Sequence, residues 1–290
     1  MDRTPALRAL TTFRMGGTPV RYYHPHTHEE LRAALGECRR CALAWRPLGG
    51  GSNLLVDEGA LPFAVIHVRR PGFGRFERVG PRTVRVGAGM PTAALLARCH
   101  RAGLGGLEFL AGLPGTIGGA ACGNAGAWGR QIADVLTRLQ LVRPDADAEW
   151  VSRAALQCEY RHTNVGDAVV TAVELAVEPC APELVARRMA ECKDARTARH
   201  PAGRPSAGCI FRNPPGHSAG KLLDLCGLKG RRAGKAEVSE QHANFILNRG
   251  GATAADVLTL VTTMREAVRS RFNLELEMEV EHWPAGVRAA

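Results

Sequence analysis

Leu48-Gly-Gly-Gly-Ser-Asn-Leu-Leu55 and Gly106-Leu-Glu-Phe-Leu-Ala-Gly-Leu-Pro-Gly-Thr-Ile-Gly-Gly-Ala-Ala-Cys-Gly-Asn-Ala-Gly126 are the two stretches that concentrate the glycine of this chain. Consecutive glycines let backbone N–H groups turn toward one point without side chains in the way, as a phosphate or pyrophosphate requires. Neutral donors stand beside them at Ser52, Asn53, Thr116 and Asn124. Tight turns in a sheet-rich fold would explain one such loop, but two loops with flanking donors favour a nucleotide ligand.

Two common nucleotide-binding motifs do not fit these loops. Neither loop reads G-x-G-x-x-G between a strand and a helix, which excludes the Rossmann fingerprint. Gly216-His-Ser-Ala-Gly-Lys221 has three residues where a P-loop has four, and Leu222 stands where Ser or Thr binds Mg²⁺. A P-loop NTPase is therefore excluded.

Length and composition indicate a globular protein of about two domains. The 290 residues are 45% hydrophobic and 23% charged, which excludes a disordered chain, a coiled coil and a disulfide-stapled miniprotein. The net charge of +10 fits either a generally basic proteome or a cleft for anionic small molecules. Aromatic residues make up only 5% and form no stripe with basic residues, so we expect no nucleic-acid partner.

The nine cysteines are scattered, several of them in apolar segments, which argues against a secreted disulfide framework. Cys38 and Cys41 have C-x-x-C spacing but no second pair and no histidine at ligand spacing, so we expect no metal site. Neither an apolar signal core nor a run of 18 apolar residues is present, and we expect a cytoplasmic protein without membrane insertion.

Periodicity and capping signals predict a mixed α+β chain. A capping box at Thr27–Glu30 opens a first helix. We expect further helices at 92–100, 182–198, 218–226 and from Thr253, and strands at 63–68, 84–86, 136–142, 168–177, 243–247 and 274–280.

The order of the motifs resembles the UDP-N-acetylenolpyruvoylglucosamine reductase (MurB) family. The resemblance rests on Thr12-Phe-Arg-Met-Gly-Gly17, both glycine loops, Tyr160-Arg161, Pro205-Ser-Ala-Gly-Cys-Ile-Phe-Arg-Asn-Pro214, Ala219-Gly-Lys221, Gly227-Leu-Lys-Gly230, Val238-Ser-Glu-Gln-His-Ala-Asn-Phe-Ile246 and Leu276-Glu-Met-Glu-Val280. These matches run in order from about residue 11 to 280. The short 160–205 region resembles the shorter form of the family.

The resemblance implies an α+β protein with a two-subdomain FAD-binding fold of the vanillyl-alcohol-oxidase/PCMH type and a smaller α+β substrate domain. We expect the FAD subdomains at 1–72 and 73–195, and the substrate domain with a C-terminal catalytic strand at 196–290. Two departures from the family pattern stand out. Thr11 replaces the usual Asn, and Cys209 stands where the family usually carries a proton-donating Ser.

The implied reaction is the NADPH-dependent reduction of UDP-N-acetylenolpyruvoylglucosamine to UDP-N-acetylmuramate through non-covalent FAD, for peptidoglycan synthesis. Hydride passes from flavin N5 to the enolpyruvyl C3, and Cys209 gives a proton to C2. A thiol has a reference pKa of about 8.5, far below that of a serine hydroxyl, and is able to protonate carbon while it stays neutral. Arg161 stabilises the enolate and Glu279 supports the enol form, with Glu275, Glu277 and Glu281 as alternative registers for this carboxylate.

The remaining site residues follow from the same motifs. We expect the cofactor to contact Gly49, Gly50, Gly51, Ser52, Asn53, Leu54, Pro114, Gly115, Thr116, Gly119, Asn124 and Gly126. Substrate contacts are expected at Tyr160, Arg212, Asn213, Lys221 and His242, although Lys221 and His242 fit structural caps equally well. The expected partners are the UDP-sugar substrate and NADPH, with no obligatory protein partner.

Two other functions use similar sequence features. A related flavin oxidase would share the FAD fold, although a covalent-flavin version calls for His or Cys beside the glycine loop, and 48–55 has neither. A non-enzymatic nucleotide-binding protein would share the loops without the chemistry. Flavin absorbance and its bleaching by NADPH separate these three functions.

Overall fold

The computed structural model describes residues 4–144, 146–201 and 203–286. The fold divides into two units, each assembled from stretches that are separate in the sequence. The first unit takes the described residues of Met1–Val20, Gly51–Pro62 and Thr197–Ala290, and the second takes those of Arg21–Gly50 and Phe63–Arg196. The three consecutive domains expected from the sequence stay a prediction.

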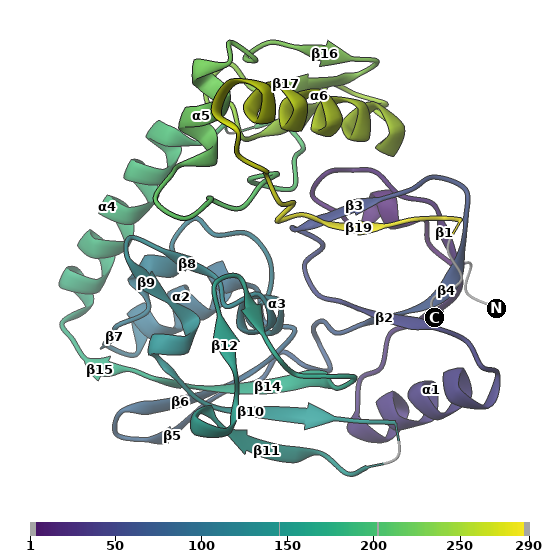
Figure 1. Cartoon of the computed structure of the whole chain (residues 1–290). Helices are drawn as coiled ribbons and strands as arrows, with labels where there is room; N and C mark the ends of the chain where they lie inside the picture. Colours follow the sequence, from purple (N-terminus) through teal and green to yellow (C-terminus); the bar gives the residue numbers. More distant parts are fainter. Residues whose placement is uncertain (1–3, 145, 202, 287–290) are drawn as a thin grey trace. The chain divides into compact units, whose positions relative to one another are not determined.

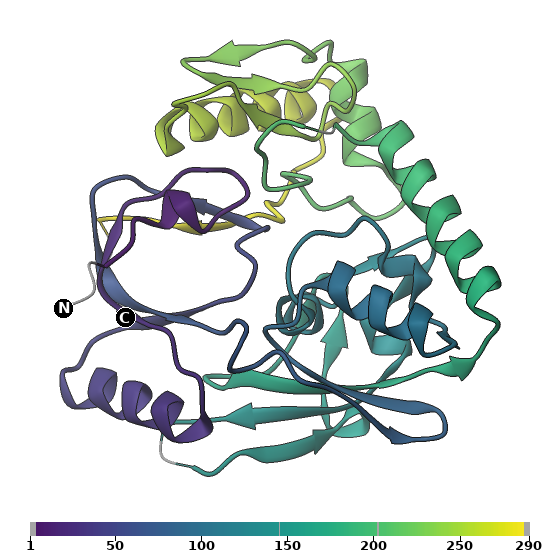
Figure 2. The ribbon, with the colours of Figure 1, turned by 180° about the vertical axis from the view of Figure 1, so that it is seen from behind.

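A five-stranded antiparallel sheet is the centre of the second unit. Its strand order is β11 (Glu149–Ser152), β10 (Leu136–Val142), β14 (Val169–Ala176), β6 (Thr83–Gly87) and β5 (Phe76–Gly80). The central strand β14 is buried along almost its whole length and is mainly apolar, with Glu174 paired to Arg85 and Arg138. Its Val173 lies opposite Leu139 of one neighbouring strand and Val86 of the other. Helices α2 (Thr92–Arg101) and α3 (Ile117–Cys122) lie on the same side of this sheet (Figures 1 and 2).

Helix α1 (His28–Arg40) contributes Leu31 and Leu35 to the same hydrophobic core. It precedes β2 (Trp45–Leu48), which pairs in parallel with β4 (Ala60–His67), so that Leu48 lies opposite His67. Strand β1 (Thr18–Tyr23) borders β4 on its other side. The shorter elements of this part of the chain are β7 (Leu104–Gly105), η2 (Glu108–Leu110), β8 (Gly126–Ala127), β9 (Arg130–Gln131), η3 (Ile132–Asp134), η4 (Arg153–Ala155), β12 (Cys158–Glu159), β13 (His162–Thr163) and β15 (Glu178–Pro179). The long helix α4 (Pro182–Arg199) follows β15.

The first unit packs helices on a small antiparallel sheet. Strands β16 (Arg232–Ala233), β17 (Ala236–Val238) and β18 (Ile246–Asn248) are covered by α6 (Ala254–Phe272), with α5 (Ala219–Leu225) beside it (Figure 1). Its core contains Phe13, Phe211 and Met264. The unit also holds η1 (Leu7–Ala9) and a parallel pair formed by β3 (Leu54–Val56) and β19 (Glu281–Trp283).

The elements with strong local signals are confirmed. Thr27 accepts a hydrogen bond from the Glu30 backbone N–H at the start of α1. Thr253 and Asp256 form a complete capping box at the start of α6, which ends at Asn273 in the left-handed conformation. Helices α2, α4 and α5 and strands β4, β6, β10 and β14 lie within a few residues of their predicted positions, whereas β18 begins three residues later than predicted.

The predicted final strand at 274–280 is wrong. Residues 274–280 form one isolated bridge, between Met278 and Phe211, with the backbone hydrogen bonds that flank it, and the C-terminal strand is β19 at Glu281–Trp283. The alternation of Leu and Glu has another cause, because Leu276 and Val280 are buried while Glu275 and Glu277 are exposed. Burial of one face of the segment therefore explains the alternation of apolar and charged residues, and continuous strand pairing is not needed.

Replacing Trp283 by alanine tests the importance of the C-terminal strand. Trp283 is 1% exposed, and its indole N–H donates to Glu281 Oε1 at 2.7 Å. We expect Trp283→Ala to lower the free energy of unfolding by about 3–5 kcal/mol because it empties a large buried volume. Leu225→Ala is the matched control, since Leu225 is 50% exposed in the same unit. Denaturant unfolding that shows equally small losses of unfolding free energy for both variants would contradict the role of the buried Trp283 in stabilising this unit.

Candidate flavin and substrate site

The first glycine loop is held from below by a buried histidine. His67 is 5% exposed, and its Nε2 lies 3.0 Å from the Gly49 carbonyl oxygen while its Nδ1 lies 2.7 Å from the Tyr22 hydroxyl. A carbonyl only accepts, so Nε2 carries the proton and Nδ1 accepts from Tyr22. Burial, followed by the charge of Arg69, lowers the pKa of His67 to about 4. The ring is therefore uncharged and supports the loop through its hydrogen bond to the Gly49 carbonyl.

The two glycine loops meet backbone to backbone in the second unit. A Cβ atom added to Gly50 would lie 2.5 Å from Gly115 Cα, and one added to Gly49 would lie 2.6 Å from Thr116 Oγ1. Neither position has room for a side chain. The Gly115 carbonyl in turn accepts from the Thr92 backbone N–H at 3.1 Å, which ties the second loop to the start of α2.

Gly119 shows that the second loop also has an open face. Thr116 caps α3 by accepting from the Gly119 N–H, and Gly119 is exposed. A Cβ added to Gly119 would meet only Thr116 Oγ1, at 3.6 Å. Backbone that is bare on the solvent side beside a glycine-to-glycine contact fits the close approach of a pyrophosphate, so these residues suit FAD. Of the other cofactor contacts expected in this loop, Pro114 is exposed and Gly126 is half-buried.

The Asn124 side chain is engaged within the protein. Its amide N–H groups donate to Gln131 Oε1 at 3.0 Å and to the Glu159 carbonyl at 2.8 Å, while its oxygen accepts from the Ala133 backbone N–H. Asn124 is 1% exposed. A contact from Asn124 to the cofactor stays a prediction for its backbone, whereas its side chain anchors the segment that precedes Tyr160.

Tyr160 and Arg161 form the turn of the β12–β13 hairpin. Arg161 has φ +60°, an uncommon conformation for a residue other than glycine. Its Nη1 lies 3.4 Å from the Gly126 carbonyl, and its guanidinium lies 5.0 Å from the centre of the Tyr160 ring. The Thr163 hydroxyl donates to the Ala121 carbonyl at 2.7 Å. The hairpin is therefore fastened to α3, the helix that follows the second glycine loop.

The rest of the first glycine loop, from Gly51 to Leu54, belongs to the first unit. Gly51 has φ +60°, and a Cβ there would lie 2.2 Å from the Leu10 carbonyl oxygen. The packing of the chain at this position therefore requires glycine, whether or not a ligand is bound. Asn53 Nδ2 donates to the Glu279 carbonyl at 3.0 Å, and the Asn53 carbonyl accepts from the Glu281 N–H. Ser52 is half-buried, and Leu54, the first residue of β3, is buried. This loop therefore positions the backbone of Glu279.

Cys209 and Glu279 lie on neighbouring segments of one short ladder. The Ile210 N–H donates to the Asn244 carbonyl, and the Ile210 carbonyl accepts from the Glu279 N–H, both at 2.8 Å. Cys209 forms a bridge with Phe245. Asn244 is 2% exposed, and its amide bonds both the N–H and the carbonyl of Phe211. Both proposed catalytic side chains are half-buried here.

Four residues expected to bind substrate also lie in the first unit. Arg212 Nε is buried and has no hydrogen-bond acceptor among the described residues. Asn213 Oδ1 accepts from the Ala219 N–H, and Lys221 is exposed on the first turn of α5. The His242 ring packs on α5, because a Cβ at Gly220 would lie 2.7 Å from His242 Cε1. Burial and the neighbouring His200 lower the pKa of His242.

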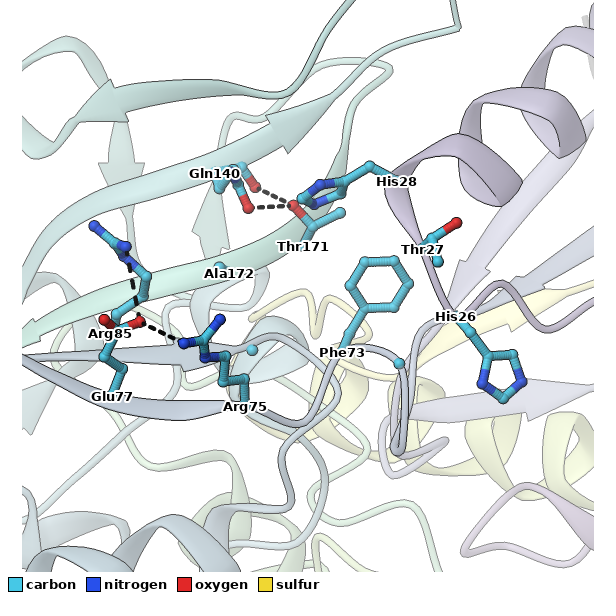
Figure 3. Close-up of a pocket in the computed structure, with 12 residues that line it drawn as sticks. His26, Thr27, His28, Phe73, Arg75, Glu77, Arg85, Gln140, Thr171 and Ala172 are labelled. Atoms are coloured by element: carbon cyan, nitrogen blue, oxygen red, sulfur yellow. Dashed lines mark hydrogen bonds and ion pairs between the residues drawn. The ribbon is translucent and has the colours of Figure 1, made fainter.

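The second unit also contains a cavity of about 380 Å³. It is lined by polar side chains that include Arg75, Glu77 and Arg85, with Phe73 and His28 beside them (Figure 3). The Thr171 hydroxyl and Gln140 Oε1 are 3.1 Å apart on its wall. None of its lining residues belongs to the expected site, so we assign it no role.

Comparison with known proteins matches both parts of the chain. Residues 19–152 match the family model for an FAD binding domain, and residues 200–283 match that for the C-terminal domain of UDP-N-acetylenolpyruvoylglucosamine reductase. Together with the two glycine loops, these matches define an FAD-dependent oxidoreductase. The predicted α+β class, with an FAD-binding fold and a second domain, is confirmed.

Full-length relatives narrow the class. UDP-N-acetylenolpyruvoylglucosamine reductase of Moorella thermoacetica is 38% identical over 96% of this chain and 91% of its own length. That of an Anaeromyxobacter species is 40% identical over 96% and 87%. The crystal structure of the Thermus caldophilus enzyme superposes with a TM-score of 0.83 and 39% identity, covering 97% of this chain and 98% of that one. The chain belongs to the UDP-N-acetylenolpyruvoylglucosamine reductase family.

Sequence reasoning missed the residues that support the site. His67 lies inside the strand predicted at 63–68 and Asn244 inside a quoted motif, but neither position shows which backbone group its side chain will reach. Among the helices that the structure describes, none combines the length and apolar character needed to cross a bilayer.

The pKa of His67 makes a testable contribution to acid stability. The folded-state pKa of about 4 lies below the usual 6.5. The stability that the neutral His67 ring contributes is therefore complete above pH 6.5 and is lost as the pH falls toward 4. Between pH 7 and pH 4, we expect the difference in unfolding free energy between wild type and His67→Gln to shrink by about 3 kcal/mol. Denaturant titrations at several pH values measure it, with the exposed His217→Gln as control. A pH-independent difference would contradict the buried, neutral ring.

Proposed function

We propose that this chain reduces UDP-N-acetylenolpyruvoylglucosamine to UDP-N-acetylmuramate, with NADPH as the reductant, in peptidoglycan precursor synthesis. The observation that carries the proposal is the ladder of the first unit. Ile210 connects the backbone of Asn244 with that of Glu279, and Asn53 of the glycine loop bonds the same Glu279 backbone. A proton donor, a carboxylate and a cofactor loop thereby share one rigid frame. We also propose that the enzyme acts in the cytoplasm.

The chain's own residues bind the cofactor and control charge. Bound FAD supplies the hydride-transfer chemistry. Gly119 offers bare backbone to its pyrophosphate, beside the contact between Gly50 and Gly115, and the buried His67 holds Gly49 in place. The small-molecule partners that we propose beside FAD are the UDP-sugar and NADPH.

Arg161 is proposed to stabilise the substrate anion. Reduction of the enolpyruvyl ether builds negative charge on C2 and its carboxylate. A guanidinium is permanently cationic and offers forked donors, which suit a carboxylate whose charge grows in the transition state. The hairpin turn, fastened by Thr163 and Asn124, restricts where that guanidinium lies.

Cys209 is proposed to deliver the proton to C2. The family usually carries serine at this position, and a thiol gives a proton more readily than a hydroxyl. Glu279, carried by the same ladder, supports the enol form. Arg212 adds a buried Nε donor that no described protein group engages, which suits an anionic part of the UDP-sugar.

An anaerobic spectral titration of the purified holoprotein tests the function. We expect NADPH to bleach the visible flavin absorbance and the enolpyruvyl UDP-sugar to restore it without oxygen, because the substrate accepts the hydride. Restoration by oxygen alone would indicate an oxidase. Colourless protein that binds no added FAD would indicate a nucleotide-binding protein without this chemistry.

Gly119 separates cofactor binding from folding. Gly119→Leu places a side chain on the open face of the second loop, so we expect FAD content to fall more than about tenfold while the apoprotein keeps its unfolding free energy. Gly50→Ala meets the Gly115 backbone instead and is expected to lower the stability of the apoprotein. Gly36→Leu, on α1, is the control. Full flavin content in Gly119→Leu would show that this loop does not hold the pyrophosphate.

Stopped-flow kinetics of each half-reaction test Cys209. We expect Cys209→Ala to keep FAD binding and reduction by NADPH, and to slow oxidation by the UDP-sugar about 10²–10⁴-fold, because a positioned acid is lost. Cys209→Ser should retain substantial activity, since serine occupies this position in most of the family. Cys226→Ala, at a half-buried cysteine of the same unit, is the matched control. Unchanged substrate kinetics in the alanine variant would place the acid elsewhere.

A further inference from the structure

Three side chains able to ligate a metal converge in the first unit. One ligand atom each from His200, Cys209 and His242 lie within 4.8 Å of one another. The three residues come from separate segments: the residue after α4, the strand-like segment at 209–212, and the turn before β18. All three are half-buried. Sequence reasoning expected no metal site, because the Cys38–Cys41 pair has neither a second pair nor a histidine at ligand spacing.

The scaffold around the cluster is specific. Cys209 bridges to Phe245, whose N–H donates to the His242 carbonyl at 2.9 Å, so one turn places His242 beside Cys209. The rings of His200 and His242 stack with centres 5.3 Å apart, and both meet the Phe245 ring edge-on.

His200 is held in place through the end of α4. Gln241 Nε2 donates to the carbonyls of Thr197 and Ala198, at 3.1 and 3.2 Å. The last turn of the helix is therefore bonded to the residue that precedes His242. Lys229 lowers and Asp224 raises the pKa of His242, and these two side chains pair with each other at 2.9 Å.

We propose that His200, Cys209 and His242 bind a borderline-soft divalent transition metal ion, with Zn²⁺ as the type case. One thiolate and two imidazoles match the ligands that Zn²⁺ prefers, and the absence of a carboxylate from the trio disfavours Mg²⁺ and Ca²⁺. Bonds of about 2.0–2.3 Å in a tetrahedron place ligand atoms roughly 3.3–3.6 Å apart. Side-chain movements of about 1 Å close the present spacing and leave the fourth position for water or substrate.

Binding at this site has a consequence for turnover, which rests on the proposed function of Cys209. A metal–sulfur bond forms as the S–H bond breaks, and the proton leaves to solvent. The thiolate then has no proton for the substrate C2. The ion therefore blocks oxidation of the enzyme by the UDP-sugar and leaves reduction by NADPH unchanged. A serine at this position binds Zn²⁺ poorly, so the sensitivity is a property of the cysteine.

Equilibrium dialysis of the holoprotein against Zn²⁺, in chelator-free buffer, tests the site without reference to activity. We expect one ion per chain in wild type. His200→Asn and Cys209→Ser should weaken binding at least about 100-fold, because even an outer-shell partner contributes about 10–100-fold. His217→Asn, an exposed histidine of the same unit, should bind as wild type. Co²⁺ absorption beyond the flavin bands reports the sulfur ligand.

The outcomes separate the site from the function. Zn²⁺ binding that is absent in wild type, or undiminished in both His200→Asn and Cys209→Ser, overturns the site. In stopped-flow assays, Zn²⁺ should slow oxidation of the reduced enzyme by the UDP-sugar in wild type and have no effect on this step in active Cys209→Ser and His200→Asn, which supports the whole proposal. Specific binding without any slowing keeps the metal site and overturns the acid role of Cys209. His200→Gln repeats the test if His200→Asn folds poorly.

Discussion

The contact between two bare stretches of backbone, at Gly50 and Gly115, is the constraint on which the cofactor half of this protein depends. A side chain on Gly50 would collide with the Gly115 backbone, so the loops can meet only as glycine against glycine. His67 supports one loop through Gly49, and the start of α2 supports the other through Thr92. The meeting of the two loops in this unit, at the proposed cofactor site, therefore depends on packing inside the polypeptide.

In the first unit, a buried side-chain amide has the corresponding role. Both ends of the Asn244 amide bond the backbone of Phe211, which aligns the segment that carries Cys209 and Arg212. A buried amide with both ends satisfied specifies one register, because any slip would leave polar groups unpaired. The same segment brings Cys209 to two histidines, so one frame supports both the proposed proton transfer and the proposed metal site.

The sequence predicted what depends on neighbouring residues. The caps predicted at Thr27 and Thr253 mark helix starts that hold in the structure. The strand at 274–280 failed because alternating Leu and Glu report burial on one face, and burial does not require a continuous partner strand. Glu279 therefore lies on a bridged segment that Asn53 helps to hold.

By itself, the sequence determined the fold class, the two glycine loops and the family, because these depend on local conformational rules and on motifs in a set order. Only the tertiary structure decided that His67 carries the first loop, that the Asn124 side chain anchors the hairpin of Arg161, and that His200 joins Cys209 and His242. Each of these contacts joins side chains to partners far away in the chain. No local pattern encodes such a partner, because the partner is chosen by packing of the whole unit.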